Sequence, residues 1–141
     1  MQEKEVIVEK LINYFEKQFE INEINCDFLS DKIKSFSIEP TASDPIVNEC
    51  IDGSYCAQFT FAFASRVSYS MDKMDNILNN DFGQRIIKLI KKNNDNGILP
   101  EIDGIETIKV TSNPFAYQTS INTARYQINM KIIYWVGGQY E

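Results

Sequence analysis

Carboxylates are the first residues of this chain with a chemistry to consider. Asp44, Asp52, Asp72 and Asp75, together with Arg66, are the residues from which a general acid–base site would be built. Acidic residues beside turns and at helix starts usually cap the backbone, and these four occupy such positions. We therefore expect a protein without catalytic residues, and a small enzyme is the less favoured alternative.

Thiol and metal chemistry have little support in the sequence. The chain has no histidine, which removes the commonest metal ligand and the usual acid–base group near neutral pH. Its three cysteines are Cys26, Cys50 and Cys56, an odd number that argues against a disulfide framework. Cys50 and Cys56 flank an Asp-Gly turn and can approach each other across a hairpin, but small buried thiols are the favoured interpretation. The chain also lacks P-loop, GxGxxG and GxSxG motifs, so we expect no metal and no cofactor.

The stretch that organises the chain runs over residues 35–69, and its second half alternates at period two. The heavier face carries Tyr55, Ala57, Phe59, Phe61, Phe63 and Val67, and the smaller face carries Cys56, Gln58, Thr60, Ala62 and Ala64. This pattern predicts a strand with helices packed on its aromatic side. The small face would let a second layer or a neighbouring subunit approach closely. Asp52-Gly53 predicts a two-residue hairpin turn between residues 46–51 and this strand.

Four short segments carry a resemblance to a known family: EPTASDPIVNECIDGS, FAFASR, GILPEI and TARYQI, in this order. Together they resemble the small proteins of long-tailed bacteriophages described as minor capsid or tail terminator (tail-to-head joining) proteins. The resemblance extends from about residue 35 to the end, and no chemical mechanism is attached to any of its motifs. It implies a tail-terminator-like fold and a homo-oligomeric ring, of six subunits, that caps the tail tube protein and ends its polymerisation. The ring would then join the tail to a head–tail connector protein. A head-side minor capsid or connector component is the alternative.

Size and composition are those of one globular domain over residues 1–141, with 43% hydrophobic residues. No apolar run approaches the roughly 20 residues that span a bilayer, so no membrane partner is expected. The N-terminus, MQEKEVIVEK, lacks the apolar core of a signal peptide. We expect assembly in the bacterial host cytoplasm, and the resemblance places the final product in the virion tail.

Charge argues against a nucleic-acid-binding module, because the net charge is −6 and the pI is about 4.7. Lys88, Lys91 and Lys92 fall near a predicted helix C-terminus, where they complement the helix dipole. Genomic DNA is expected only to pass through the ring, whose lumen would be lined by acidic and uncharged polar residues. The alternative is that the acidity serves solubility alone.

The remaining elements follow from periodicity and breakers. An amphipathic helix is predicted over residues 2–19; its polar face is mixed in sign, which favours core packing over binding to a membrane surface. A short strand is predicted over residues 32–38. A helix from Met71, capped by Ser70, is predicted to break or kink at residues 79–81 and to continue from Phe82 until Gly97. The polar run over residues 93–96 is predicted to be a fraying helix end. Strands are predicted over residues 105–111 and 119–136. The order indicates an α+β fold with a single mixed or antiparallel sheet and helices packed on one face.

The candidate functional residues are those of a subunit or partner interface. The two prolines before residues 46–51 predict that this hairpin projects as an arm, although an ordinary surface hairpin is the alternative. Long strands with free edges risk edge-to-edge pairing, which an oligomer avoids. The predicted contact residues are Asp44, Pro45, Ile46, Val47, Asp52 and Gly53 on the arm, with Arg66 and Arg125 as charge partners.

Overall fold

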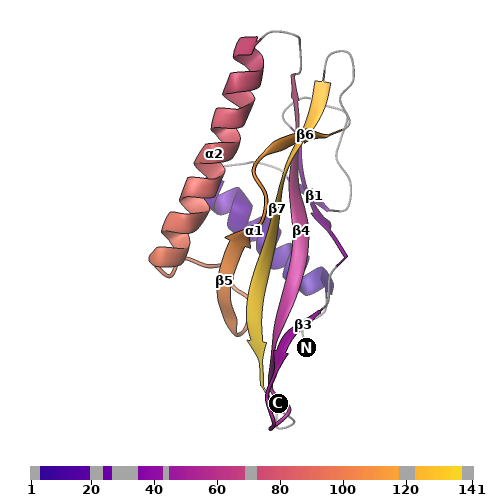
Figure 1. The fold of residues 1–141 in the computed structure, drawn as a ribbon, viewed down its shortest axis with the longest axis vertical. Coiled ribbons are helices and arrows are strands. Elements are labelled where there is room, and N and C mark those ends of the chain that lie inside the picture. Colours follow the sequence, from indigo (N-terminus) through magenta and orange to yellow (C-terminus); the bar gives the residue numbers. More distant parts are fainter. Residues whose placement is uncertain are drawn as a thin grey trace.

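The computed structural model describes residues 4–19, 24–26, 35–42, 45–68, 73–117 and 123–137. They form an α+β fold, which confirms the predicted class (Figure 1). The elements in chain order are α1 (Lys4–Phe19), β1 (Ile24–Cys26), β2 (Ser35–Pro40), β3 (Ile46–Glu49), β4 (Tyr55–Ser68), α2 (Lys73–Asp95), β5 (Ile105–Val110), β6 (Phe115–Tyr117) and β7 (Thr123–Val136). The short strands β1 and β6 were not predicted.

Two long strands, β4 and β7, form the centre of the sheet. They pair antiparallel without a register shift from Tyr55 opposite Val136 to Ser68 opposite Thr123. The sheet order is β1-β2-β4-β7-β5, with β3 attached to β4 and β6 attached to β7. Because β1 and β2 are parallel and the other pairs are antiparallel, the sheet is mixed.

On the side of β4 away from β7, strands β2 and β3 pair with two different parts of β4. β2 pairs with the second half of β4, and β3 pairs with its first residues. Between them the Thr41 N–H donates to the Thr60 carbonyl at 2.9 Å, and the Gln58 N–H donates to the Pro45 carbonyl at 2.9 Å. The loop between β2 and β3 therefore interrupts the pairing with β4 only briefly. The hydrogen bonds on both sides of the loop keep β3 aligned beside β4.

The core lies on the aromatic face of β4, as predicted. Phe15 of α1 stacks on Phe63 of β4 at 4.9 Å between ring centroids, and Phe36 of β2 stacks on the same ring at 5.9 Å. α1 crosses behind the sheet in Figure 1, and α2 lies beside β5. Ile86 and Ile90 of α2 are buried in the same cluster, so both helices contribute to one core. Burying these aromatic and branched side chains supplies the main driving force for folding.

The helix α2 is continuous over 23 residues, and the predicted break at residues 79–81 is wrong. Asn and Asp lower helix propensity by only about 0.7 kcal/mol each, and a run without proline can be carried through by packing on either side. The predicted end is confirmed. Gly97 has φ +74°, the Ile98 N–H donates to the Asn93 carbonyl at 2.8 Å, and the Gly97 N–H donates to the Asn94 carbonyl at 3.2 Å. Ser70 and Met71 lie outside the described residues.

Asparagines at the end of α2 were predicted to fray, and the structure corrects this. The Asn93 side chain is buried and donates to the Tyr14 hydroxyl at 3.0 Å and to the Gln18 side-chain carbonyl at 3.2 Å. The Asn94 side chain donates to the Ile108 carbonyl and accepts from the Ile108 N–H at 3.1 Å. These amides attach α2 to α1 and to the edge of β5, because a buried polar group needs a partner.

The turn between β3 and β4 also differs from the prediction. The Cys50 N–H donates to the Ser54 carbonyl at 2.8 Å, so the loop between them holds three residues, not two. The Gly53 N–H donates to the Cys50 carbonyl at 3.1 Å, and Gly53 has φ 91°. This is the three-residue hairpin loop that ends with a glycine of positive φ. No helix in the described part of the chain is long and apolar enough to cross a membrane.

Candidate functional site: an exposed hairpin arm

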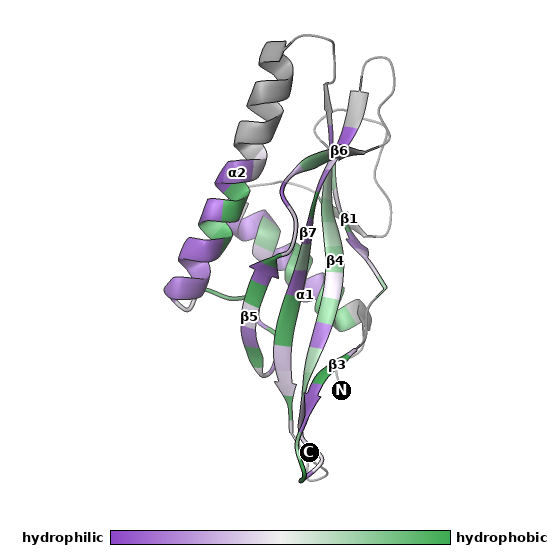
Figure 2. Ribbon diagram, in the orientation of Figure 1, coloured by the Kyte–Doolittle hydropathy of each residue, from purple (hydrophilic) through white to green (hydrophobic). Residues whose placement is uncertain are grey.

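We call residues 45–57 the hairpin arm; they comprise β3, the turn and the start of β4. All four residues of β3 are exposed. Among the arm's apolar side chains, Val47 is 51% exposed and Ile51, at the tip, is 108% exposed. Figure 1 shows the arm at one end of the sheet, and Figure 2 shows β3 beginning hydrophobic and ending hydrophilic. Several apolar residues exposed on one hairpin are a candidate contact surface.

Two of the predicted residues, Asp52 and Gly53, build the turn and do not themselves form an apolar contact. The Asp52 carboxylate accepts a hydrogen bond from the Ser54 N–H at 2.9 Å and another from the Ser54 hydroxyl. These bonds lower the pKa of Asp52, which keeps it ionised and unsuited to act as a general acid. Their structural effect is to present Ile51 at the tip. Ile51 falls within the predicted contact arm, residues 45–54, but it was not singled out, although an apolar residue directly before Asp-Gly was the available signal.

The exposed surface continues across the sheet to β7. Cys56 lies opposite Asn48 on one side and opposite Trp135 on the other, so the three share one face. Trp135 is 40% exposed. Sequence reasoning missed it, because the period-two pattern places it after Ile133 at the end of a face that is polar from Arg125 to Lys131. Large exposed aromatic residues are enriched at protein–protein interfaces.

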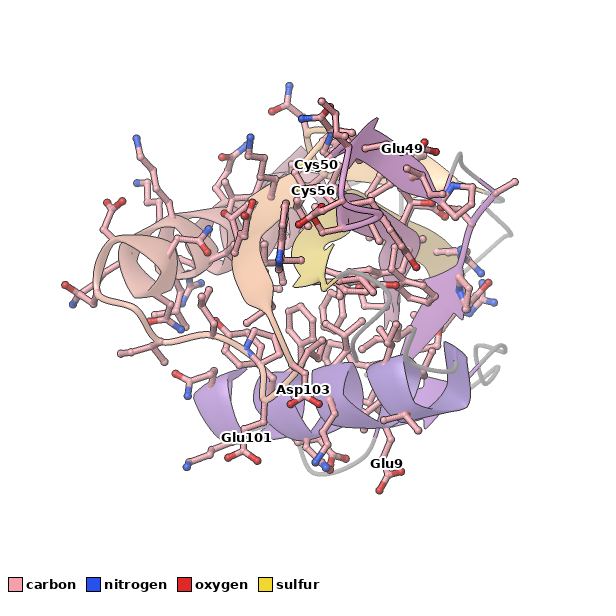
Figure 3. All side chains as sticks on the ribbon, turned by 90° about the horizontal axis from the view of Figure 1, so that it is seen from below. Glu9, Glu49, Cys50, Cys56, Glu101 and Asp103 are labelled. Atoms are coloured by element: carbon pink, nitrogen blue, oxygen red, sulfur yellow. The ribbon has the colours of Figure 1, made fainter. Side chains whose placement is uncertain are left out.

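The two cysteines of the arm lie at the same end of the molecule (Figure 3). Both are free, and the Cys56 sulfur is 4.0 Å from a carboxylate oxygen of Glu106. Partial desolvation raises the pKa of the Cys56 thiol, and the neighbouring Glu106 and Cys50 raise it further. A thiol that stays protonated is a poor nucleophile, so the surroundings of Cys56 do not favour a reactive thiolate. The side chain of Cys26 lies outside the described residues.

The predicted charge partners, Arg66 and Arg125, are placed far from the arm of the same chain. Arg66 and Arg125 are opposite each other in the β4–β7 pair. Arg66 is eleven residues along β4 from Tyr55, a distance of about 37 Å at about 3.4 Å per residue. The Arg125 guanidinium donates to the Glu39 carboxylate at 2.7 Å. Arg125 therefore already has an acidic partner within the chain.

This ion pair explains why the small face of β4 is covered. Glu39 is on β2 and Arg125 is on β7, so their bond must pass over β4, which lies between them. Ala62 and Ala64 are 2% and 0% exposed at this point. Gln127 accepts from Arg125 at 2.9 Å and donates to Asn129 at 3.1 Å, which extends the polar strip along β7. Over this part of the small face, the chain's own polar side chains form the outer layer.

Of the residues considered for catalysis, the structure describes the side chains of Asp52 and Arg66 alone, and these two lie far apart. Asp52 lies at the tip of the arm, whereas Arg66 lies near the far end of β4. Asp75 is on α2, and its side chain is outside the described residues, as are Asp44 and Asp72. Among the described side chains, no group of three or more Cys, Asp or Glu residues is placed to hold a metal ion.

No protein-family model matches the chain, and no curated protein matches it significantly. We therefore infer the function from the arrangement of the chain's own residues. Its most distinctive exposed feature is the hairpin arm.

Proposed function

We propose that this protein is a structural component of a long-tailed bacteriophage or prophage, a tail terminator that assembles into a ring of six subunits, as the segment resemblance implies. The ring caps the tail tube, ends its polymerisation and offers a surface to the head–tail connector. It acts by shape and contact, without chemistry. The observation that carries the proposal is the projecting hairpin arm, with Ile46, Val47 and Ile51 exposed to solvent.

The physical case rests on the cost of leaving such an arm in water. Burying apolar surface is worth about 25 cal/mol per Å², so covering several branched side chains favours association. An arm at one edge of a subunit contacts a different surface on the next, and such heterologous contacts generate closed rings when the rotation closes. The segment resemblance over residues 39–54 includes most of this arm, so the resemblance and the exposed apolar residues fall on the same stretch of the chain.

The experiment is to measure the mass in solution and to image the particles. Light scattering over a range of concentrations, and negative-stain microscopy of the protein with purified tail tubes, would show rings in solution or caps on tube ends. The tubes should also stop growing when the protein is added. A protein that stays monomeric in both settings, and leaves tube growth unchanged, contradicts the proposal.

The position of the ring is tested with the same reagents. A tail terminator binds tube ends, whereas the alternative, a head-side minor capsid or connector component, binds connector particles and not tubes. Because the net charge is −6 per chain, we expect duplex DNA to bind only weakly at low salt. Submicromolar DNA binding in a gel shift would contradict passage through a repelling lumen and would favour the head-side alternative.

A further inference from the structure

A groove lies between α2 and β5, at the edge of the sheet opposite the arm. It has a volume of about 290 Å³ and is lined by Ile87, Ile90, Lys91, Asn94, Ile108, Lys109 and Val110. This is near the lower limit of small-molecule pockets, which hold about 300–1,000 Å³, and it suits a few protein side chains better than a larger ligand. Its floor is partly closed by the bonds between Asn94 and the Ile108 backbone, which occupy the polar groups of the β5 edge at that residue.

The arm and the groove occupy opposite lateral edges of the same end of the sheet. β3 pairs with β4 on the side away from β7, and β5 pairs with β7 on the side away from β4. Ala57 faces Ile46 on one side and Tyr134 on the other, and Tyr134 in turn faces Ile105. One row across the sheet thus begins on the arm and ends on β5. The groove residues of β5, Ile108 to Val110, lie further along the sheet, in the rows of Phe59 to Phe61. A second copy placed beside the first and displaced along the strands by these few residues brings its arm next to this groove.

The two surfaces are complementary in charge as well as in apolar character. The arm combines Ile46, Val47 and Ile51 with the acidic residues Glu49 and Asp52, and residues 45–53 include no Lys or Arg. The groove combines branched apolar residues with Lys91 and Lys109, and none of its seven described lining residues is acidic. Contact between two arms would instead bring like charges together, which is unfavourable.

We propose that the hairpin arm of one subunit docks in the α2–β5 groove of the next copy of this chain, with Glu49 placed near Lys109. This inference rests on the proposed ring and names the receiving surface within it. Each subunit gives an arm at one edge and receives an arm at the other, so the contact is heterologous.

The test reverses the two charges separately and then mixes the variants. Glu49→Lys alone and Lys109→Glu alone each place like charges in every contact, and we expect association to weaken about tenfold or more. In an equimolar mixture, alternating subunits restore an opposite-charge pair at every contact. The reversed arm of the Glu49→Lys variant meets the reversed groove of the Lys109→Glu variant, and the unchanged arm of the second variant meets the unchanged groove of the first. We expect the mixture to assemble nearly as well as the wild type in light scattering and negative stain.

The matched control is Glu101→Lys, which makes the same charge change on an exposed residue near α1, on a different side of the molecule from Glu49 (Figure 3). It should leave association unchanged, and circular dichroism should show that all variants are folded. If the wild type forms rings but the reversals have no effect, or the mixture does not recover, the groove is not the docking surface and the ring proposal stands. If the wild type does not assemble alone or on tubes, both proposals fail.

Discussion

At Gly83, the helix propensity of the local sequence and the packing of the tertiary structure predict opposite effects of one substitution. It lies inside α2, where glycine is about 1 kcal/mol less favourable than alanine. Helix propensity alone therefore predicts that Gly83→Ala stabilises the protein. The structure predicts the opposite, because a Cβ at this position would lie 2.5 Å from Cγ and 2.6 Å from Cβ of Pro114. The ring of proline is closed and cannot rotate out of the way.

The size of the change follows from these two opposing effects. Overpacking a well-packed site costs about 1–3 kcal/mol, and the gain in helix propensity offsets about 1 kcal/mol of it. We therefore expect Gly83→Ala to lower the free energy of unfolding by up to about 2 kcal/mol. Replacing Pro114 by glycine removes both overlapping atoms, so in that background Gly83→Ala should become neutral or stabilising. The coupling between the two substitutions should be about 1–3 kcal/mol.

The assay is urea unfolding followed by circular dichroism, with the four proteins of the double-mutant cycle measured together. Gly97→Ala is the control: nothing lies within 4 Å of an added Cβ, and only the positive φ of +74° penalises it. It should cost about 1–2 kcal/mol whether or not Pro114 is present. A Gly83→Ala variant that is about 1 kcal/mol more stable than the wild type, or one that Pro114→Gly does not rescue, would refute the steric reasoning.

Three further predictions concern polar contacts. Arg125→Met should lower the free energy of unfolding by about 1.5–3 kcal/mol, because Glu39 loses its charged partner, and a cycle with Glu39→Gln should show that the two effects are coupled. Asn94→Ala should destabilise by about 1–3 kcal/mol and should speed hydrogen exchange at the Ile108 amide, which loses its acceptor; unchanged exchange there would contradict the bond. Burial raises the pKa of Tyr14 above its ordinary value of 10.0, although the hydrogen bond to its hydroxyl partly opposes this. The unfolded state therefore ionises first, so the contribution of Tyr14 to stability is complete below pH 10 and declines as the pH rises above it. Urea midpoints at alkaline pH should decline less steeply in Tyr14→Phe, and an equally steep decline would show that Tyr14 is not responsible.

Local signals in the sequence were enough to predict several elements. The alternation from Tyr55 to Val67 predicted β4 and its buried face, because a strand turns successive side chains to opposite sides. A second alternating stretch, in residues 119–136, predicted β7. Gly97 predicted the end of α2, because only a residue without a Cβ adopts positive φ at little cost. The arm was also predicted from local signals, namely the prolines and the Asp-Gly pair.

Features that join residues far apart in the chain depend instead on the complete fold. Arg125 and Glu39 are 86 positions apart, and Asn93 and Tyr14 are 79 apart. No periodicity links such pairs, since their meeting depends on how β2, β4 and β7 are ordered in the sheet. The continuity of α2 through its weak helix formers has a similar origin, because packing on its buried residues outweighs a small deficit in propensity. The α2–β5 groove exists only because the chain brings that helix back against the last strand of the sheet order, a long-range arrangement that no local pattern encodes.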